Sequence, residues 1–102
     1  MAESLGVCVS TRNNFDHVLG LAKAAQKAEK KVEIFFTGDG VLCTQNPRLS
    51  DLITIAHVTI CEVSYFANGY KGIEIPGLGD KDFVTQARNA EMVEESDRYV
   101  IL

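Results

Sequence analysis

The chain has 102 residues, of which 46% are hydrophobic and 24% are charged. This length corresponds to one domain, residues 1–102, and the apolar content supports a buried core, which excludes a disordered tail. The formal net charge of −4 comes without the clustered cationic face of a nucleic-acid binder. No apolar run approaches the roughly 20 residues of a membrane span. We therefore predict neither a nucleic-acid nor a membrane partner.

The chain contains three cysteines, at positions 8, 43 and 61. Because the number is odd, a fully paired disulfide framework is excluded. The first residues, 1–4, include an acid and no basic segment, so no secretory signal is predicted. We expect a cytoplasmic protein in which these thiols stay reduced.

The first part of the chain predicts a strand, a helix and a second strand. Residues 5–10 and 32–37 are short apolar runs rich in β-branched or aromatic residues, typical of strands buried on both faces. Asn13 or Asn14 is the expected helix cap between them. A stripe at helical spacing follows this cap, formed by Phe15, Val18, Leu19, Ala22 and Ala25. This order predicts two parallel neighbouring strands.

The middle of the chain continues the alternation of helices and strands. A short helix is expected after Pro47, and residues 57–61 predict a third strand. Residues 63–67 predict a further short helix that ends near Gly69. The segment between residues 41 and 46 shows no regular pattern.

The last third predicts a fourth strand, a helix and a closing strand. Residues 72–75 form a brief β-like run that ends at Pro76. Asp80 is the expected cap of the last helix, whose core-facing residues are predicted to be Phe83, Ala87, Ala90 and Val93. Residues 98–102 close the chain as a strand. The whole order predicts an α/β fold, a three-layer α/β/α sandwich.

The carboxyl ends of the predicted strands are where a ligand would bind in such a sheet. A turn rich in glycine follows the second strand, and its backbone amides are able to cradle a small anion. The candidate ligand-binding residues at this edge are Ser10, Thr37, Gly38, Asp39 and Gly40. Their spacing matches neither a phosphate-binding Walker loop nor a dinucleotide fingerprint. A tight turn without a ligand is the alternative interpretation.

Cys61 is the candidate reactive residue. It ends a predicted buried strand and precedes a helix, whose amides and dipole favour the thiolate, whereas Glu62 beside it favours the thiol. A buried structural thiol is the alternative interpretation. Cys8 is expected in the core and Cys43 in an exposed, oxidisable loop. The cysteine and histidine spacings match no zinc site, so we predict no metal and no cofactor.

Several segments resemble the DsrE/DsrF-like family of small sulfur-relay proteins, which includes the TusD-type subunits. The similar segments occur in order along essentially the whole chain: Ile34-Phe35-Phe36 running into Gly38-Asp39-Gly40-Val41, Ile60-Cys61 followed by Gly69, Pro76-Gly77-Leu78-Gly79, and Glu95-Ser96-Asp97-Arg98-Tyr99-Val100. The resemblance depends on this combination and on no single motif.

The resemblance implies a flavodoxin-like fold with about five mainly parallel strands, assembled into a homo-oligomer, a trimer or hexamer. In sulfur-carrying members a cysteine after the third strand holds a persulfide, and Cys61 has that position here. The implied partners are other sulfur-relay proteins, which act as donor and acceptor. Basic residues commonly precede the following glycine in those members, whereas Ala67 and Asn68 precede Gly69 in this sequence.

These observations lead to alternative functional hypotheses. The first is a sulfur-relay protein that carries or transfers persulfide sulfur through Cys61, as a sulfur carrier or sulfurtransferase. The second is a non-enzymatic oligomeric module that binds a small anion or metabolite at the turn from Thr37 to Gly40. A flavin or nucleotide protein is less favoured, because no phosphate loop is recognisable. The apolar residues Val41, Leu42, Val63, Tyr65 and Phe66 either contact neighbouring subunits or complete the core.

Overall fold

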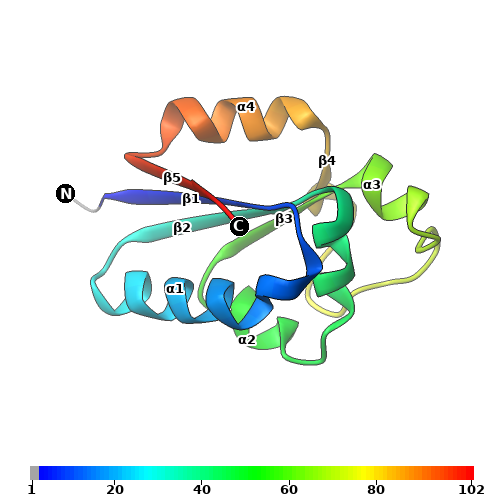
Figure 1. Cartoon of the computed structure of the whole chain (residues 1–102), viewed down its shortest axis with the longest axis horizontal. Helices are drawn as coiled ribbons and strands as arrows, with labels where there is room; N and C mark the ends of the chain where they lie inside the picture. The colour runs from blue at the N-terminus through cyan, green and yellow to red at the C-terminus, as the bar shows by residue number, and fades with distance from the viewer. Residues whose placement is uncertain (1–2) are drawn as a thin grey trace.

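A parallel sheet forms the centre of the computed structural model, which describes residues 3–102. Its strands are β1 (Ser4–Val9), β2 (Lys31–Phe36), β3 (His57–Cys61), β4 (Phe83–Val84) and β5 (Arg98–Ile101). They lie in the order β4-β3-β2-β1-β5, and every neighbouring pair is parallel. The carboxyl ends of β1, β2 and β3 therefore meet at one end of the sheet (Figure 1).

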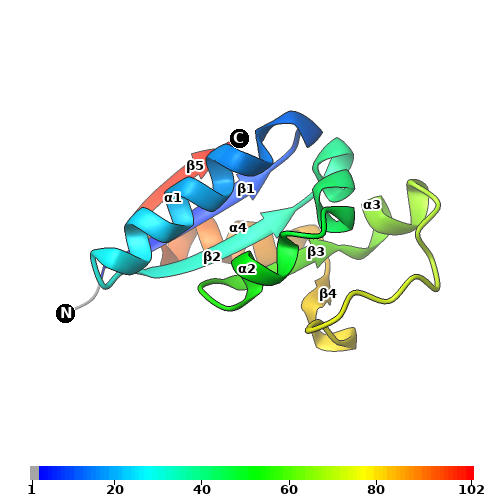
Figure 2. The ribbon, with the colours of Figure 1, turned by 90° about the horizontal axis from the view of Figure 1, so that it is seen from below.

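Helices cover both faces of this sheet and complete the three predicted layers. Helices α1 (Phe15–Lys27) and α2 (Leu49–Ile53) lie on one face, and α4 (Gln86–Glu95) lies on the other (Figures 1 and 2). The short helix α3 (Glu62–Ala67) continues directly from the end of β3. Three 3-10 helices, η1 (Arg12–Asn14), η2 (Gly38–Gln45) and η3 (Asp80–Asp82), complete the secondary structure. Within residues 3–102, no helix has both the length and the apolar character that crossing a membrane requires.

The core has a larger and a smaller part, on the two faces of the sheet. Successive side chains of a strand point to opposite faces, so Ile34 and Phe36 of β2 pack with the α1 and α2 side. Phe35 packs on the other face, in a small cluster under α4. The predicted stripe of α1 is buried along its whole length. Because both faces are covered, the three central strands are mainly apolar, as their sequences predict.

Residues 72–75 do not form the predicted fourth strand. They belong to an irregular segment between α3 and η3, in which Gly72 and Gly77 both have positive φ. Ile75 is buried as a single anchor, and the carbonyl of Ile73 accepts a hydrogen bond from the Tyr65 hydroxyl. These side-chain and turn contacts replace a strand ladder. The fourth strand is instead the two-residue β4, paired with β3.

The last helix starts later than predicted and presents a different face to the sheet. Asp80 begins η3, and Thr85 caps α4 through its Oγ1, which accepts from the Ala87 amide. Met92 is the buried residue of the helix, whereas Val93 is exposed. The expected stripe is wrong because polar side chains of α4 also face the sheet and find partners there. Arg88 donates a hydrogen bond to Glu33, and Asn89 accepts one from the Tyr99 hydroxyl.

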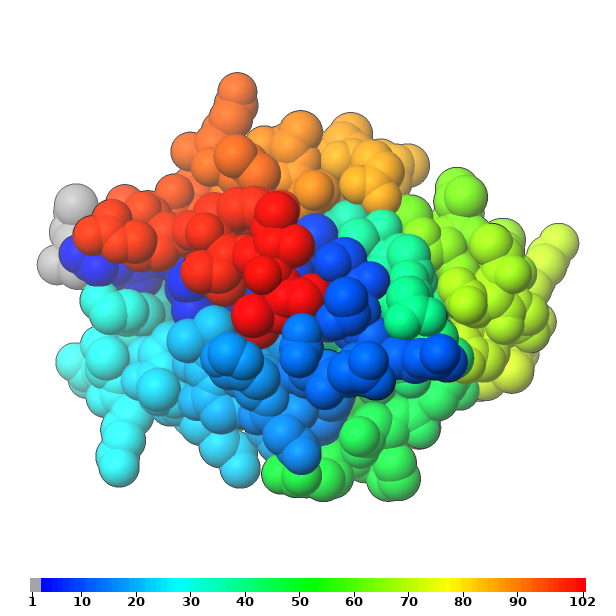
Figure 3. Space-filling model, in the orientation of Figure 1, coloured from blue at the N-terminus to red at the C-terminus, as the bar shows by residue number. Residues whose placement is uncertain are grey.

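The apolar residues outside the predicted strands divide between core and surface. Val41 and Tyr65 are fully buried within the chain, so they complete its core. Val63 and Phe66 of α3 are exposed. The edge strand β5 lies at the surface between α1 and α4 (Figure 3), where the Ile101 side chain is exposed.

Candidate functional site

Cys61 lies at the junction of β3 and α3: it is the last residue of β3 and the N-cap residue of α3. The alternation of β3 directs Ile60 toward the larger core and Cys61 toward the α4 side. There the residue packs with Cys8, Phe35 and Met92, and only 3% of its surface is exposed. The thiol is therefore beneath the surface at the carboxyl end of the sheet.

A set of polar side chains surrounds this thiol, and we call Cys61, Thr37, Ser64 and Gln86 the thiol network. The Gln86 amide lies 3.6 Å from the Cys61 sulfur and donates to Thr37 Oγ1 at 2.8 Å. Thr37 Oγ1 lies 3.4 Å from Ser64 Oγ. The backbone amide of Gly38 donates to the same Ser64 oxygen at 2.9 Å. The network thus joins the ends of β2 and β3 to the first residue of α4.

The thiol network gives Cys61 a pKa below the ordinary value. Burial by itself raises the pKa, but interactions with the Ser64 hydroxyl and amide, the Thr37 hydroxyl and the Gln86 amide lower it by more. Burial raises the pKa of both Cys8 and Cys43, without a comparable set of donors. Among the three thiols, Cys61 is the one whose surroundings favour the nucleophilic thiolate.

One contact of the Cys61 sulfur comes from an exposed side chain. Gln86 is an exposed residue in the first turn of α4, and it holds its position through its hydrogen bond to Thr37. A long exposed side chain exchanges rotamers on the picosecond to nanosecond timescale. Cys61 is thus buried in the resting arrangement, but the residue above its sulfur is not part of the packed core.

The other predicted ligand-binding residues make contacts within the protein. Ser10 donates from its backbone amide and hydroxyl to the Leu102 carbonyl. Asp39 accepts from the Arg12 backbone and forms an exposed ion pair with its side chain. The Gly40 amide donates to the Thr37 carbonyl, and Gly40 packs against the β1 backbone. Of the predicted set, only Thr37 and Gly38 come together with Cys61.

Cys43 is not the exposed loop residue that the sequence predicts. The η2 helix buries it in the larger core. Its thiol lies 3.7 Å from the Thr11 carbonyl and 3.6 Å from the Arg12 carbonyl, as a donor to both. The prediction fails because an irregular sequence folds here into a 3-10 helix that packs against η1. Cys8 is buried, as predicted.

Sequence reasoning did not identify Ser64 and Gln86 as members of the site. Ser64 has a local signal, because it is the third residue after Cys61 and the N3 position of a helix faces its N-cap residue. Gln86 has no such signal. It is 25 residues from Cys61 in sequence, and only the packing of α4 on the sheet brings the two together.

Iodoacetamide should alkylate Cys61 before the other cysteines of the folded protein. The midpoint of the alkylation rate against pH should lie below the ordinary pKa of a cysteine thiol. Ser64→Ala removes the hydroxyl that contributes most to the lowering, so the midpoint should move to higher pH and the rate at pH 7 should fall by about threefold. Intact mass and peptide mapping across a pH series measure both quantities.

Ser50→Ala is the matched control for this measurement, because Ser50 is an exposed serine of α2 far from the thiol network. It should leave the profile unchanged. Modification of Cys43 before Cys61, or an unchanged midpoint in Ser64→Ala, would contradict the assignment of the thiol network.

Comparison with known proteins assigns no family to this chain. No protein-family model matches the sequence. No curated protein matches it at a significant level. The function is therefore inferred from the chemistry of the thiol network together with the resemblance described for the sequence.

Proposed function

We propose that this protein carries sulfur as a persulfide on Cys61 and passes it to an acceptor protein. The observation that carries the proposal is the contrast among the three thiols. Hydroxyl and amide groups surround Cys61 and lower its pKa, whereas burial raises the pKa of Cys8 and Cys43. A carrier thiol needs exposure, thiolate character and a docking surface, but no acid/base pair of its own. Cys61 is only 3% exposed, so the proposal requires its surroundings to open for the transfer.

The transfer step follows the chemistry of thiol–disulfide exchange. The Cys61 thiolate attacks the terminal sulfur of a donor persulfide, and a new sulfur–sulfur bond forms on Cys61 as the donor's sulfur–sulfur bond breaks. The donor leaves as a thiolate, which takes up the proton that Cys61 lost. The acceptor thiolate then repeats the attack on the Cys61 persulfide, so no external oxidant or reductant is needed.

The thiol network suits the charge changes of this step. The amide of Gln86 and the hydroxyls of Thr37 and Ser64 are hydrogen-bond donors, and the persulfide and thiolate forms are both anionic acceptors. Gln86 has to rotate away when the sulfur is transferred, because its amide lies 3.6 Å from the thiol. This requirement restricts access to donors that can displace an exposed side chain.

The alternative function, an anion or metabolite site at Thr37 to Gly40, has less support. The amides of Gly38 and Gly40 already donate within the protein, to Ser64 and to Thr37. Asp39 adds a carboxylate to the same turn, which opposes an anion. The sulfur-carrier function is therefore the one we propose.

Incubation with inorganic polysulfide, followed by intact-mass measurement, tests the proposal. The wild-type protein should gain the mass of one sulfur atom, and a reducing thiol should remove it. Cys61→Ser should gain none. Cys43→Ser is the matched control, because it removes a buried thiol and its hydroxyl can donate to the same carbonyls; it should load like the wild type. A sulfur adduct that persists in Cys61→Ser, or no adduct on the wild type, would rule out the proposal.

A further inference from the structure

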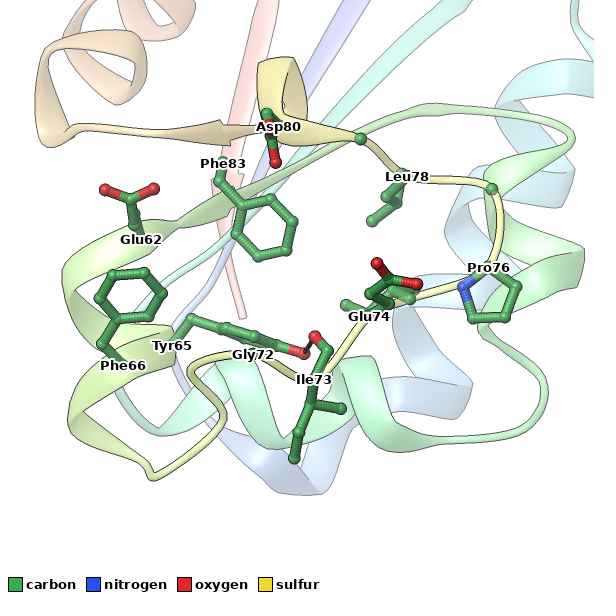
Figure 4. Close-up of a pocket in the computed structure, with 13 residues that line it drawn as sticks. Glu62, Tyr65, Phe66, Gly72, Ile73, Glu74, Pro76, Leu78, Asp80 and Phe83 are labelled. Atoms are coloured by element: carbon green, nitrogen blue, oxygen red, sulfur yellow. Dashed lines mark hydrogen bonds between the residues drawn. The ribbon is translucent and has the colours of Figure 1, made fainter.

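A second feature of the molecule is a cavity of about 890 Å³ at the β4 edge of the sheet (Figure 4). Its walls come from α3, from residues 72–80 and from Phe83 of β4. Tyr65 and Phe83 belong to the larger core, whereas Cys61 belongs to the smaller core under α4. The lining of the cavity thus shares no residue with the thiol network.

The aromatic floor of the cavity is held in a fixed position. Tyr65 is fully buried, and its ring packs against Tyr70 at 5.2 Å and Phe83 at 5.0 Å between centroids. Its hydroxyl donates to the Ile73 carbonyl at 2.8 Å, which ties the irregular segment to α3. The apolar surface of the cavity is therefore formed before any ligand binds, as is usual for small-molecule sites.

Among residues 3–102, the charged groups that line the cavity are all carboxylates. Glu62, Glu74 and Asp80 contribute to its walls, and no lysine or arginine of the described residues does. Glu74 and Asp80 point into the space bounded by Phe83 and Leu78 (Figure 4). Within residues 3–102, none of the three carboxylates has an ion pair or a side-chain hydrogen bond, although other acids of the chain do.

One aromatic ring of the cavity lining already contacts an ammonium group. Lys71 Nζ lies 5.5 Å from the centroid of Phe66, which is one of the lining residues. This distance is typical of a cation–π interaction. The aromatic surface and the carboxylates therefore select the same kind of group, a cation with an apolar body.

We propose that this cavity binds a small organic cation, a primary amine or a guanidinium group carried on an apolar body. Glu74 and Asp80 would receive the cationic group, and the side chains of Phe83 and Leu78 would contact the apolar body. The volume lies within the range of small-molecule sites, about 300 to 1,000 Å³. The whole wall comes from residues 62–83, so one chain is sufficient to form the site. The site does not depend on sulfur transfer.

Binding of three matched probes tests this inference: phenethylamine, phenethyl alcohol and phenylacetate. In an NMR titration of the full chain with phenethylamine, the amide chemical shifts of residues 72–83 should change in a saturable way. The neutral alcohol should bind at least about tenfold more weakly, because it lacks the charge that the carboxylates select, and phenylacetate should not bind. A stronger response to the alcohol or to phenylacetate would overturn the inference.

The double variant Glu74→Gln with Asp80→Asn should weaken phenethylamine binding by about tenfold. The control with the same change in net charge is Asp51→Asn with Glu94→Gln, two exposed acids on α2 and α4 outside the cavity. It should retain wild-type binding. If both double variants weakened phenethylamine binding equally, the binding would come from general charge attraction and not from the cavity. If a lysine-containing peptide bound more tightly than phenethylamine, the cavity would be a site for a protein partner. Either result would overturn the inference.

Discussion

Gly40→Ala should lower the free energy of unfolding by about 3 kcal/mol or more. A Cβ atom at this position would lie 2.0 Å from the Val9 carbonyl oxygen and 2.6 Å from its carbon. Both atoms belong to the backbone of a buried central strand, so no rotamer change relieves the clash. The change must separate η2 from the end of β1. Urea unfolding followed by circular dichroism measures the loss.

Gly20→Ala is the matched control for this change. Gly20 lies in α1, and a Cβ there meets no atom within 4 Å. Alanine is the better helix former, so this variant should be more stable by about 0.5 to 1 kcal/mol. The two glycine variants should therefore move the urea midpoint in opposite directions. An unchanged midpoint in Gly40→Ala would mean that η2 does not pack on β1 as described.

Arg88→Met should lower the free energy of unfolding by about 2 to 3 kcal/mol, because it leaves a buried carboxylate without its partner. Arg88 Nε donates to Glu33 Oε2 at 2.7 Å, and Nη2 contacts the other oxygen, so the pair is bidentate. The Glu33 side chain is only 15% exposed and that of Arg88 is 26% exposed. The carboxylates around Arg88, with Glu33 the strongest, raise its pKa despite burial.

The consequence of this change should extend to the thiol network. Arg88 joins the first turn of α4 to β2, and Gln86 of the same turn covers the Cys61 sulfur. We therefore expect Cys61 of the Arg88→Met variant to be alkylated faster than Cys61 of the wild type. The variant should also unfold at a lower urea concentration. Arg48→Met is the control, since its ion pair with Asp16 is exposed on both sides and should change stability by less than about 1 kcal/mol. Equal midpoints for the two arginine variants would contradict the role of the Arg88 pair.

The central strands and the first helix were predictable because their environment is uniform. Strands covered on both faces need apolar residues at most positions, so the runs over β1, β2 and β3 are mainly apolar, with exceptions such as Glu33 of β2, which is paired with Arg88. Helix α1 buries one face along its full length, and its stripe follows the helical period. The position of Cys61 at the end of β3 follows from the same pattern.

The edge of the fold was less predictable because few of its residues are buried. β4 has only two residues, and the irregular segment before it is held by single anchors such as Ile75. Helix α4 faces the sheet partly through Arg88 and Asn89, whose burial is compensated by partners on β2 and β5. A search for apolar residues at helical spacing does not detect such a face. Its polar side chains can be buried only because residues distant in the chain provide hydrogen-bond partners.

The sequence by itself determined the α/β sandwich, the parallel central strands and the location of one cysteine at their carboxyl end. The tertiary structure decided which thiol has a lowered pKa. It buried all three thiols and placed the amide of Gln86 against Cys61, while Thr37 and Ser64 complete the donors around that sulfur. The physical reason is that a buried strand can be recognised from the hydrophobicity of its own residues. The pKa of a thiol depends on the donors within a few ångströms of it, and these come from three separate segments of the chain.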